Sequence, residues 1–217
     1  MDAEDRGEGT SSRNGSAIEA CIRGAEGRVQ IRLEDGSSFF VSSEFADRNS
    51  LVSGSHVSDA LLDSICAEDE KLRAFEKAVT LLARREHSVY ELELKLRSRG
   101  FKGNSVSAAL ERLLKVGYVD DRRFAEVWVR TRLRRNPEGY SRLAAGLYRR
   151  GVDRGIVSLV LEEIYTEEES GRALEKAAEK ILKRGNIERL AVLKKLTAKG
   201  FPYRQVEAHL QKLQLSD

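Results

Sequence analysis

The sequence predicts a mainly α-helical protein, with tandem three-helix repeats that form an elongated, curved array and a small antiparallel β element near the N-terminus. Two observations carry this prediction. The composition is rich in Lys, Arg, Glu, Leu and Ala with only two prolines, which is typical of helical proteins. A pattern of apolar residues and glycine also recurs about every 50 residues. Repeats of this kind contact only their neighbours, so a row of them gives an extended molecule.

The β element is predicted before the helices. Residues 1–16 are acidic and polar, and we expect a disordered tail that is not a secretion signal. Three short extended stretches come next at 18–22, 28–33 and 38–42; Val29, Ile31 and Leu33 alternate with polar residues, and Asp35-Gly36 is a hairpin turn signal. Such a small sheet is marginal alone, so we expect it to pack on the adjoining helical part of the chain. With a short helix over 58–66, begun by Ser58, it forms the predicted domain 17–67.

The helical repeats begin after this domain, with a helix over 71–84. Aligning the chain on Leu96, Leu147 and Leu196 brings glycine four residues later in each copy, at Gly100, Gly151 and Gly200. Further apolar positions match at Val106, Val157 and Val206, and at Leu110, Leu161 and Leu210. The glycine has a physical reason, because the chain leaves a helix there through a left-handed conformation. The predicted repeats span 68–119, 120–169 and 170–217.

The charge is strongly asymmetric along the chain. Residues 1–70 carry a net charge of −9, and residues 71–217 carry +12. A basic region of this size suggests an anionic partner. Between residues 122 and 155 there are ten arginines and only three acids. Arginine pairs with phosphates and carboxylates through a planar fork that lysine lacks, so we expect a binding surface rather than a merely solvated face.

A helical wheel separates two faces of the helix predicted over 122–135. Arg123, Arg130 and Arg134 lie within about 40° of one another on the outer face. Arg132 lies on the core side and must pair or extend to solvent. The inner face comprises Phe124, Ala125, Trp128 and Val129. The predicted binding surface comprises Arg122, Arg123, Arg130, Arg134, Arg135, Arg149, Arg150 and Arg154.

Other residues of this region are expected to be structural. Asp120 and Asp121 come after Gly117 and Tyr118, and we expect both to cap the next helix rather than to bind metal. Trp128 is expected in the core; a platform for base stacking is the alternative.

The sequence offers little support for an enzyme. It contains no Gly-rich phosphate loop and no nucleophilic triad, and we expect neither cofactor nor catalytic residues. Cys21 and Cys66 form no CxxC pair and the three histidines are scattered, so we expect no metal site. We expect a reducing compartment, no membrane-spanning segment and therefore a cytoplasmic protein, and we expect a monomer.

Three stretches resemble a known family. "SVYELELKLRSRGF" (88–101), "VGYVDDRRFAEVWVRTRL" (116–133) and "GYSRLAAGLYRRGV" (139–152) are similar to the signature of the RecX family of regulatory proteins. The resemblance covers about residues 75–213. Ala145 and Gly146 depart from it, since the family often has Glu before Leu there, and the third copy is loose.

The resemblance implies a non-enzymatic modulator of the RecA recombinase. Such proteins lie in the groove of the RecA–DNA filament and usually inhibit filament growth, ATP hydrolysis and strand exchange. The implied setting is homologous recombination, DNA repair and the SOS response, with weaker or indirect binding to single- and double-stranded DNA. Capping of filament ends and coating of the groove both stay open, as does the role of the acidic N-terminal region. The alternatives are a general DNA-binding protein and a helical adaptor for another protein.

Overall fold

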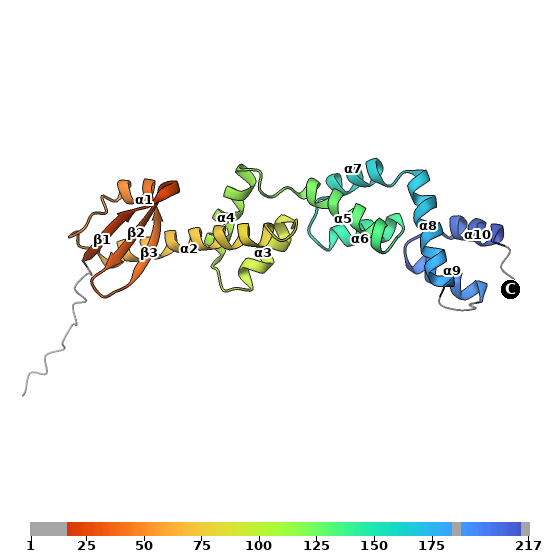
Figure 1. Cartoon of the computed structure of the whole chain (residues 1–217), viewed down its shortest axis with the longest axis horizontal. Helices are drawn as coiled ribbons and strands as arrows, with labels where there is room; N and C mark the ends of the chain where they lie inside the picture. The colour runs from red at the N-terminus through yellow and green to blue at the C-terminus, as the bar shows by residue number, and fades with distance from the viewer. Residues whose placement is uncertain (1–16, 184–187, 214–217) are drawn as a thin grey trace, which may run out of the picture. The chain divides into compact units, whose positions relative to one another are not determined.

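The chain divides into two compact units between Ala74 and Phe75. The structure, a computed structural model, describes residues 17–183 and 188–213 (Figure 1). The predicted tail at 1–16 therefore lies outside the described residues. The described part is mainly helical with one small sheet, which confirms the predicted fold class. No described helix is both long enough and apolar enough to cross a membrane.

The first unit holds an antiparallel sheet in the order β1-β2-β3. The strands are β1 (Ile18–Arg23), β2 (Arg28–Leu33) and β3 (Ser38–Ser42), and a 3-10 turn, η1 (Ala25–Gly27), joins the first two. The β2–β3 hairpin forms where Asp35-Gly36 predicts it, because Gly36 adopts φ 84°, which favours glycine. The sheet packs on α1 (Ser43–Arg48) and on the start of α2 (Asp59–Leu82).

The helix α2 corrects one prediction. The sequence suggested separate helices over 58–66 and 71–84, but α2 is continuous. The acidic stretch at 67–70 contains no Gly or Pro to end a helix. Asp69 of this stretch makes two contacts. Its carboxylate accepts a 2.8 Å hydrogen bond from the backbone N–H of Phe40 in β3 and pairs with Arg73 at 2.7 Å. The charged segment between the two predicted helices therefore anchors α2 to the sheet.

The second unit consists of three-helix repeats. The first repeat combines the end of α2 with α3 (Val89–Arg97) and α4 (Gly103–Lys115). The second contains α5 (Asp121–Arg135), α6 (Tyr140–Tyr148) and α7 (Arg154–Ile164). The third contains α8 (Glu167–Leu182), α9 (Arg189–Ala198) and α10 (Tyr203–Lys212). The first repeat has its own buried core, whereas the second and third share one.

Glycine ends the middle helix of every repeat, as predicted. Gly100, Gly151 and Gly200 have φ values of 86°, 74° and 90°. In each case the carbonyl of the aligned leucine accepts a hydrogen bond from the N–H of the residue after glycine. These bonds are Phe101 to Leu96 at 3.4 Å, Val152 to Leu147 at 3.3 Å and Phe201 to Leu196 at 3.4 Å. The repeated bond is the signature of a Schellman helix end, which satisfies carbonyls that the helix leaves open.

Candidate anion-binding surface of the second repeat

The helix α5 carries most of the predicted surface, and its ends and buried face fix its orientation. The Asp120 carboxylate caps it by accepting hydrogen bonds from the N–H groups of Arg122 and Arg123 at 2.8 and 3.0 Å. The predicted inner face is buried at Phe124, Ala125 and Val129, and Leu133 joins it. This face packs into the core shared by the second and third repeats. The arginine side chains are therefore left to the outer and lateral faces.

Asp121 does not act as the second cap that the sequence suggested. Its carboxylate accepts a 2.9 Å hydrogen bond from the backbone N–H of Val89, at the start of α3. Burial raises the pKa of Asp121, and the hydrogen bond from Val89 only partly opposes this shift. Asp121 thus ties the second repeat to the first.

Trp128 was expected in the core; its side chain is half-buried and packs against the core of the second and third repeats. A Cβ added at Gly146 would lie 2.4 Å from Cη2 of the indole, so only glycine allows α6 to come this close. The guanidinium groups of Arg150 and Arg132 lie over the ring, 4.9 and 5.5 Å from its centroid. A base could stack on this ring only by displacing an arginine.

Three arginines of the predicted surface serve internal contacts. Arg122 pairs with Glu126 at 3.2 Å and with Glu163 at 2.9 Å. Its pKa is raised by these two carboxylates, with the hydrogen bond to Glu126 as the main cause.

The other two hold the first and second repeats together. Arg123 pairs with Glu86 at 2.9 Å and donates to the carbonyl of Tyr118 at the same distance. Arg150 pairs with Glu91 at 3.3 Å and donates to the carbonyl of Gly146 at 2.8 Å. Their charges are neutralised within the chain, so they offer less to an outside anion.

Arg132 is paired, as its place on the helical wheel requires. Its partner is Glu138, whose side chain is only 2% exposed and which Arg132 binds with two nitrogens at 2.7 and 3.1 Å. Arg142 reaches the same carboxylate at 3.3 Å. A buried carboxylate must be paired in this way, so this cluster is structural.

Five predicted arginines remain exposed and available. Arg130 is 66% exposed, and its nearest acid is Glu126 at 3.9 Å. Among the residues that the structure describes, none of the other four forms an ion pair: Arg134, Arg135, Arg149 and Arg154. Arg149 and Arg154 flank the turn between α6 and α7, and no described contact joins them to the arginines of α5. The available charge is therefore concentrated at the end of α5, with a second group at the α6–α7 turn.

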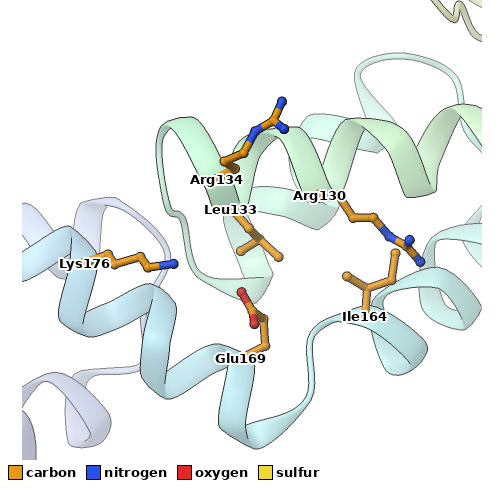
Figure 2. A pocket seen from close by; sticks show the side chains of 6 residues that line it. All are labelled: Arg130, Leu133, Arg134, Ile164, Glu169 and Lys176. Atoms are coloured by element: carbon orange, nitrogen blue, oxygen red, sulfur yellow. The ribbon is translucent and has the colours of Figure 1, made fainter.

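The α5 arginines border a hollow that faces α8. The hollow has a volume of about 260 Å³ and is lined by Arg130, Leu133, Arg134, Ile164, Glu169 and Lys176. Figure 2 shows Lys176 and Glu169 reaching into it from α8, while the Arg134 guanidinium turns away toward solvent. Arg130, Arg134 and Lys176 line the hollow against the one carboxylate of Glu169, and although the Arg134 guanidinium points to solvent, the net positive charge favours an anion.

A second hollow also has Arg134 in its lining. It measures about 280 Å³ and is lined by Arg85, Glu86, Phe124, Val127, Trp128, Thr131, Arg134 and Arg135. Lys176 and Arg85 were not predicted as site residues. Their approach to α5 depends on how helices pack across the chain, which leaves no local signal in the sequence.

The chemistry available here is anion binding. Exposed guanidinium groups suit phosphates and carboxylates equally, because both anions accept two parallel hydrogen bonds. Over the described ranges, no group of three or more His, Cys, Asp or Glu side chains could hold a metal ion.

Comparison with known proteins identifies the repeats. The family model described as "RecX, first three-helix domain" matches residues 74–113, and "RecX, second three-helix domain" matches residues 120–161. These spans correspond to the first two repeats.

Relatives named Regulatory protein RecX match as well. The protein from Pelodictyon phaeoclathratiforme is 31% identical over 139 residues, which cover 64% of this chain and 87% of that one. The protein from Chlorobium phaeobacteroides is 37% identical over 97 residues, or 45% of this chain, and the match spans 64% of the relative's length. A solved structure titled "Crystal structure of regulatory protein RecX" superposes with a TM-score of 0.71, covering 88% of this chain and 97% of that one. Because the sequence identity of this last match is 22%, the match supports the fold alone. The family models, the relatives and the repeat architecture agree, and the chain belongs to the RecX family of regulatory proteins.

Proposed function

We propose that this protein is a non-enzymatic regulator that binds the RecA recombinase and its DNA filament. It inhibits filament growth, ATP hydrolysis and strand exchange during recombination and repair. Membership of a family of regulatory proteins supports the regulatory role. The observation that carries the binding mode is the set of five exposed arginines on the second repeat: in the described chain four of them have no carboxylate partner, and the fifth, Arg130, has Glu126 only at 3.9 Å.

The surface fits a nucleoprotein filament because such a filament presents two kinds of anion. DNA offers phosphates, and a protein subunit offers Asp and Glu side chains. The arginines at the end of α5 can pair with either, and each pair is a charge-assisted hydrogen bond, stronger than a neutral one. Arg130, Lys176 and the solvent-facing Arg134 all line one hollow, and each can supply such a donor.

The structure narrows the predicted binding set. Arg130, Arg134, Arg135, Arg149 and Arg154 are proposed to contact the filament. Arg122, Arg123 and Arg150 are proposed to hold the repeats in place, because their guanidinium groups are bound by Glu163, Glu86 and Glu91. Replacing the second group would disturb the fold before it tested binding.

The test is the rate of ATP hydrolysis by RecA on single-stranded DNA, with this protein added before or after filament assembly. We expect inhibition at amounts well below one molecule per RecA subunit. Stronger inhibition on early addition would indicate that filament growth is capped, and equal inhibition would indicate binding along the groove. An unchanged rate at equimolar protein would contradict the proposal.

A second candidate is a general DNA-binding protein that acts by occupying the strand. It is favoured by the shortage of acids around the exposed arginines, which suits a phosphate backbone without any RecA contact. In that case an excess of bare DNA would abolish the effect on RecA. Under the main proposal, the filament would outcompete bare DNA.

A further inference from the structure

The middle helices of successive repeats are joined end to end. The C-terminus of α6 lies on the N-terminus of α3, where the Ser88 hydroxyl donates a 2.6 Å hydrogen bond to the carbonyl of Arg150. A Cβ added at Gly151 would lie 2.4 Å from the Cβ of Tyr90. Two features of the structure thus favour glycine at position 151: its φ of 74° and the close approach of α3.

The next joint repeats this arrangement. The C-terminus of α9 lies on the N-terminus of α6, and the N–H of Gly139 donates to the carbonyl of Lys199 at 2.9 Å. The Ser141 hydroxyl donates to the carbonyl of Gly200 at 3.1 Å. A Cβ added at Gly200 would lie 2.7 Å from the Cβ of Arg142. Ser88 and Gly139 are the N-cap residues of α3 and α6, so the two joints use equivalent positions.

Both joints have the same physical basis. A helix C-terminus leaves carbonyls open, and the start of the next helix supplies a donor to one of them: the Ser88 hydroxyl at the first joint and the Gly139 N–H at the second. Each joint also brings the negative end of one helix dipole to the positive end of another. The residue before each glycine is also a cation near an acid. Arg150 pairs with Glu91 at 3.3 Å, and Lys199 lies within electrostatic range of Glu138.

Among residues 17–183 and 188–213, two ends of this series have no joint. At the end of α3, no atom of the described chain other than those of Gly100 and its two chain neighbours lies within 4 Å of a Cβ built on Gly100, in contrast to Gly151 and Gly200. At the start of α9, Glu188 supplies no side-chain cap and is exposed. Leu190, which aligns with Tyr90, is 60% exposed. The Gly100 end corresponds to the glycine turns that lie on a helix start in the two internal joints. The start of α9 corresponds to the helix starts that these turns contact.

We propose that two copies of this chain associate head to tail, with the Gly100 turn of one copy docked on the N-terminus of α9 of the other. The two internal joints indicate what would bind at the start of α9. In both of them, a glycine turn preceded by a cation covers the equivalent helix start. Arg99 precedes Gly100 and would lie near Glu188 of the other copy, which takes the N-cap position that Ser88 and Gly139 hold at the two internal joints. A contact between unlike ends continues in an open series unless it closes into a ring.

The first test uses asparagine at Gly100. Asparagine tolerates the left-handed conformation better than other residues with a side chain, so Gly100→Asn keeps the turn but adds the Cβ that obstructs docking. The matched control is Gly117→Asn: Gly117 ends α4 with φ 70° and also has no atom within 4 Å of an added Cβ.

The measurement is the weight-average mass by sedimentation of the full chain, at concentrations up to about 1 mM, where a contact with a millimolar Kd is half formed. We expect the mass of the wild type and of Gly117→Asn to rise with concentration, and Gly100→Asn to stay at the monomer mass. A wild type that stays monomeric throughout, or a Gly100→Asn variant that associates equally well, would overturn the proposal.

A charge exchange gives an independent test. Arg99→Glu and Glu188→Arg should each weaken association, because each places like charges at the joint. An equal mixture of the two variants should associate again, because each variant then meets an opposite charge on the other. If the mixture behaves as the average of its two components, the pairing of Arg99 with Glu188 is wrong.

Discussion

The exposed arginines of α5 give a quantitative prediction for DNA binding. Each cation that neutralises a phosphate of single-stranded DNA contributes about 0.7 to the slope of log affinity against log salt concentration. Arg130 and Arg134 border one hollow, and neither has a carboxylate closer than the 3.9 Å between Arg130 and Glu126 in the described chain. Arg130→Gln combined with Arg134→Gln should therefore reduce the slope by about 1.4.

The same slope sets the loss of affinity. With a slope of 0.7, each phosphate contact makes binding about fourfold tighter at 0.15 M salt than at 1 M salt, and removing the contact loses about this factor. The double variant should thus bind about 15-fold more weakly, or about 1.6 kcal/mol. The stability of the fold should change little, because surface substitutions away from specific contacts usually fall within about 0.5 kcal/mol.

The assay is fluorescence anisotropy of a labelled oligothymidine at several salt concentrations. The control is Arg48→Gln combined with Arg97→Gln, which removes the same net charge. Both control arginines are exposed, and each pairs with an acid one helical turn away. The control should keep the wild-type slope. Equal slopes for the two double variants would show that net charge alone acts, and would refute the assignment of these residues.

Four further predictions concern residues at or next to the contacts between the first and second repeats. Gly151→Ala should cost about 1–3 kcal/mol more in urea unfolding than Gly117→Ala, because both lose the left-handed freedom of glycine but only the first meets Tyr90. Asp121→Ala should cost about 1–3 kcal/mol by leaving the Val89 N–H without a partner. Asp121→Asn keeps an acceptor and, since burial raises the pKa of Asp121 and disfavours its ionised form, should be at least as stable as the wild type at neutral pH. Burial lowers the pKa of His87, so the unfolded chain binds the proton more readily than the folded one. The free energy of unfolding should therefore fall as the pH drops below about 6.5, and this fall should be less steep in His87→Gln.

Features that depend on local sequence could be predicted. The turns at Gly100, Gly151 and Gly200 follow from conformational freedom and recur at a fixed place in each repeat. The hairpin at Asp35-Gly36 and the Asp120 cap are local in the same sense. The inner face of α5 followed from helical periodicity alone, because burial of Phe124, Ala125 and Val129 needs no knowledge of the partner helix.

Features that depend on distant partners could not be predicted. Arg123 and Arg150 looked like members of a binding surface, but Glu86 and Glu91 of the first repeat bind them. The position of Lys176 beside Arg134 depends on the packing of α8 against α5. The continuity of α2 was missed for another reason, since its acidic segment contains no residue that breaks a helix and Asp69 is held by Phe40 of the sheet.

Recognition of RecA on DNA, rather than of DNA alone, is the property that distinguishes the proposed regulator from a general DNA-binding protein. It can be measured by comparing the affinity of this protein for a RecA filament on a labelled oligothymidine with its affinity for the same oligothymidine without RecA, at one salt concentration. We expect tighter binding to the filament, with a loss of affinity for both targets in the Arg130→Gln, Arg134→Gln variant. Equal or tighter binding to bare DNA would contradict recognition of RecA and leave a general DNA-binding protein.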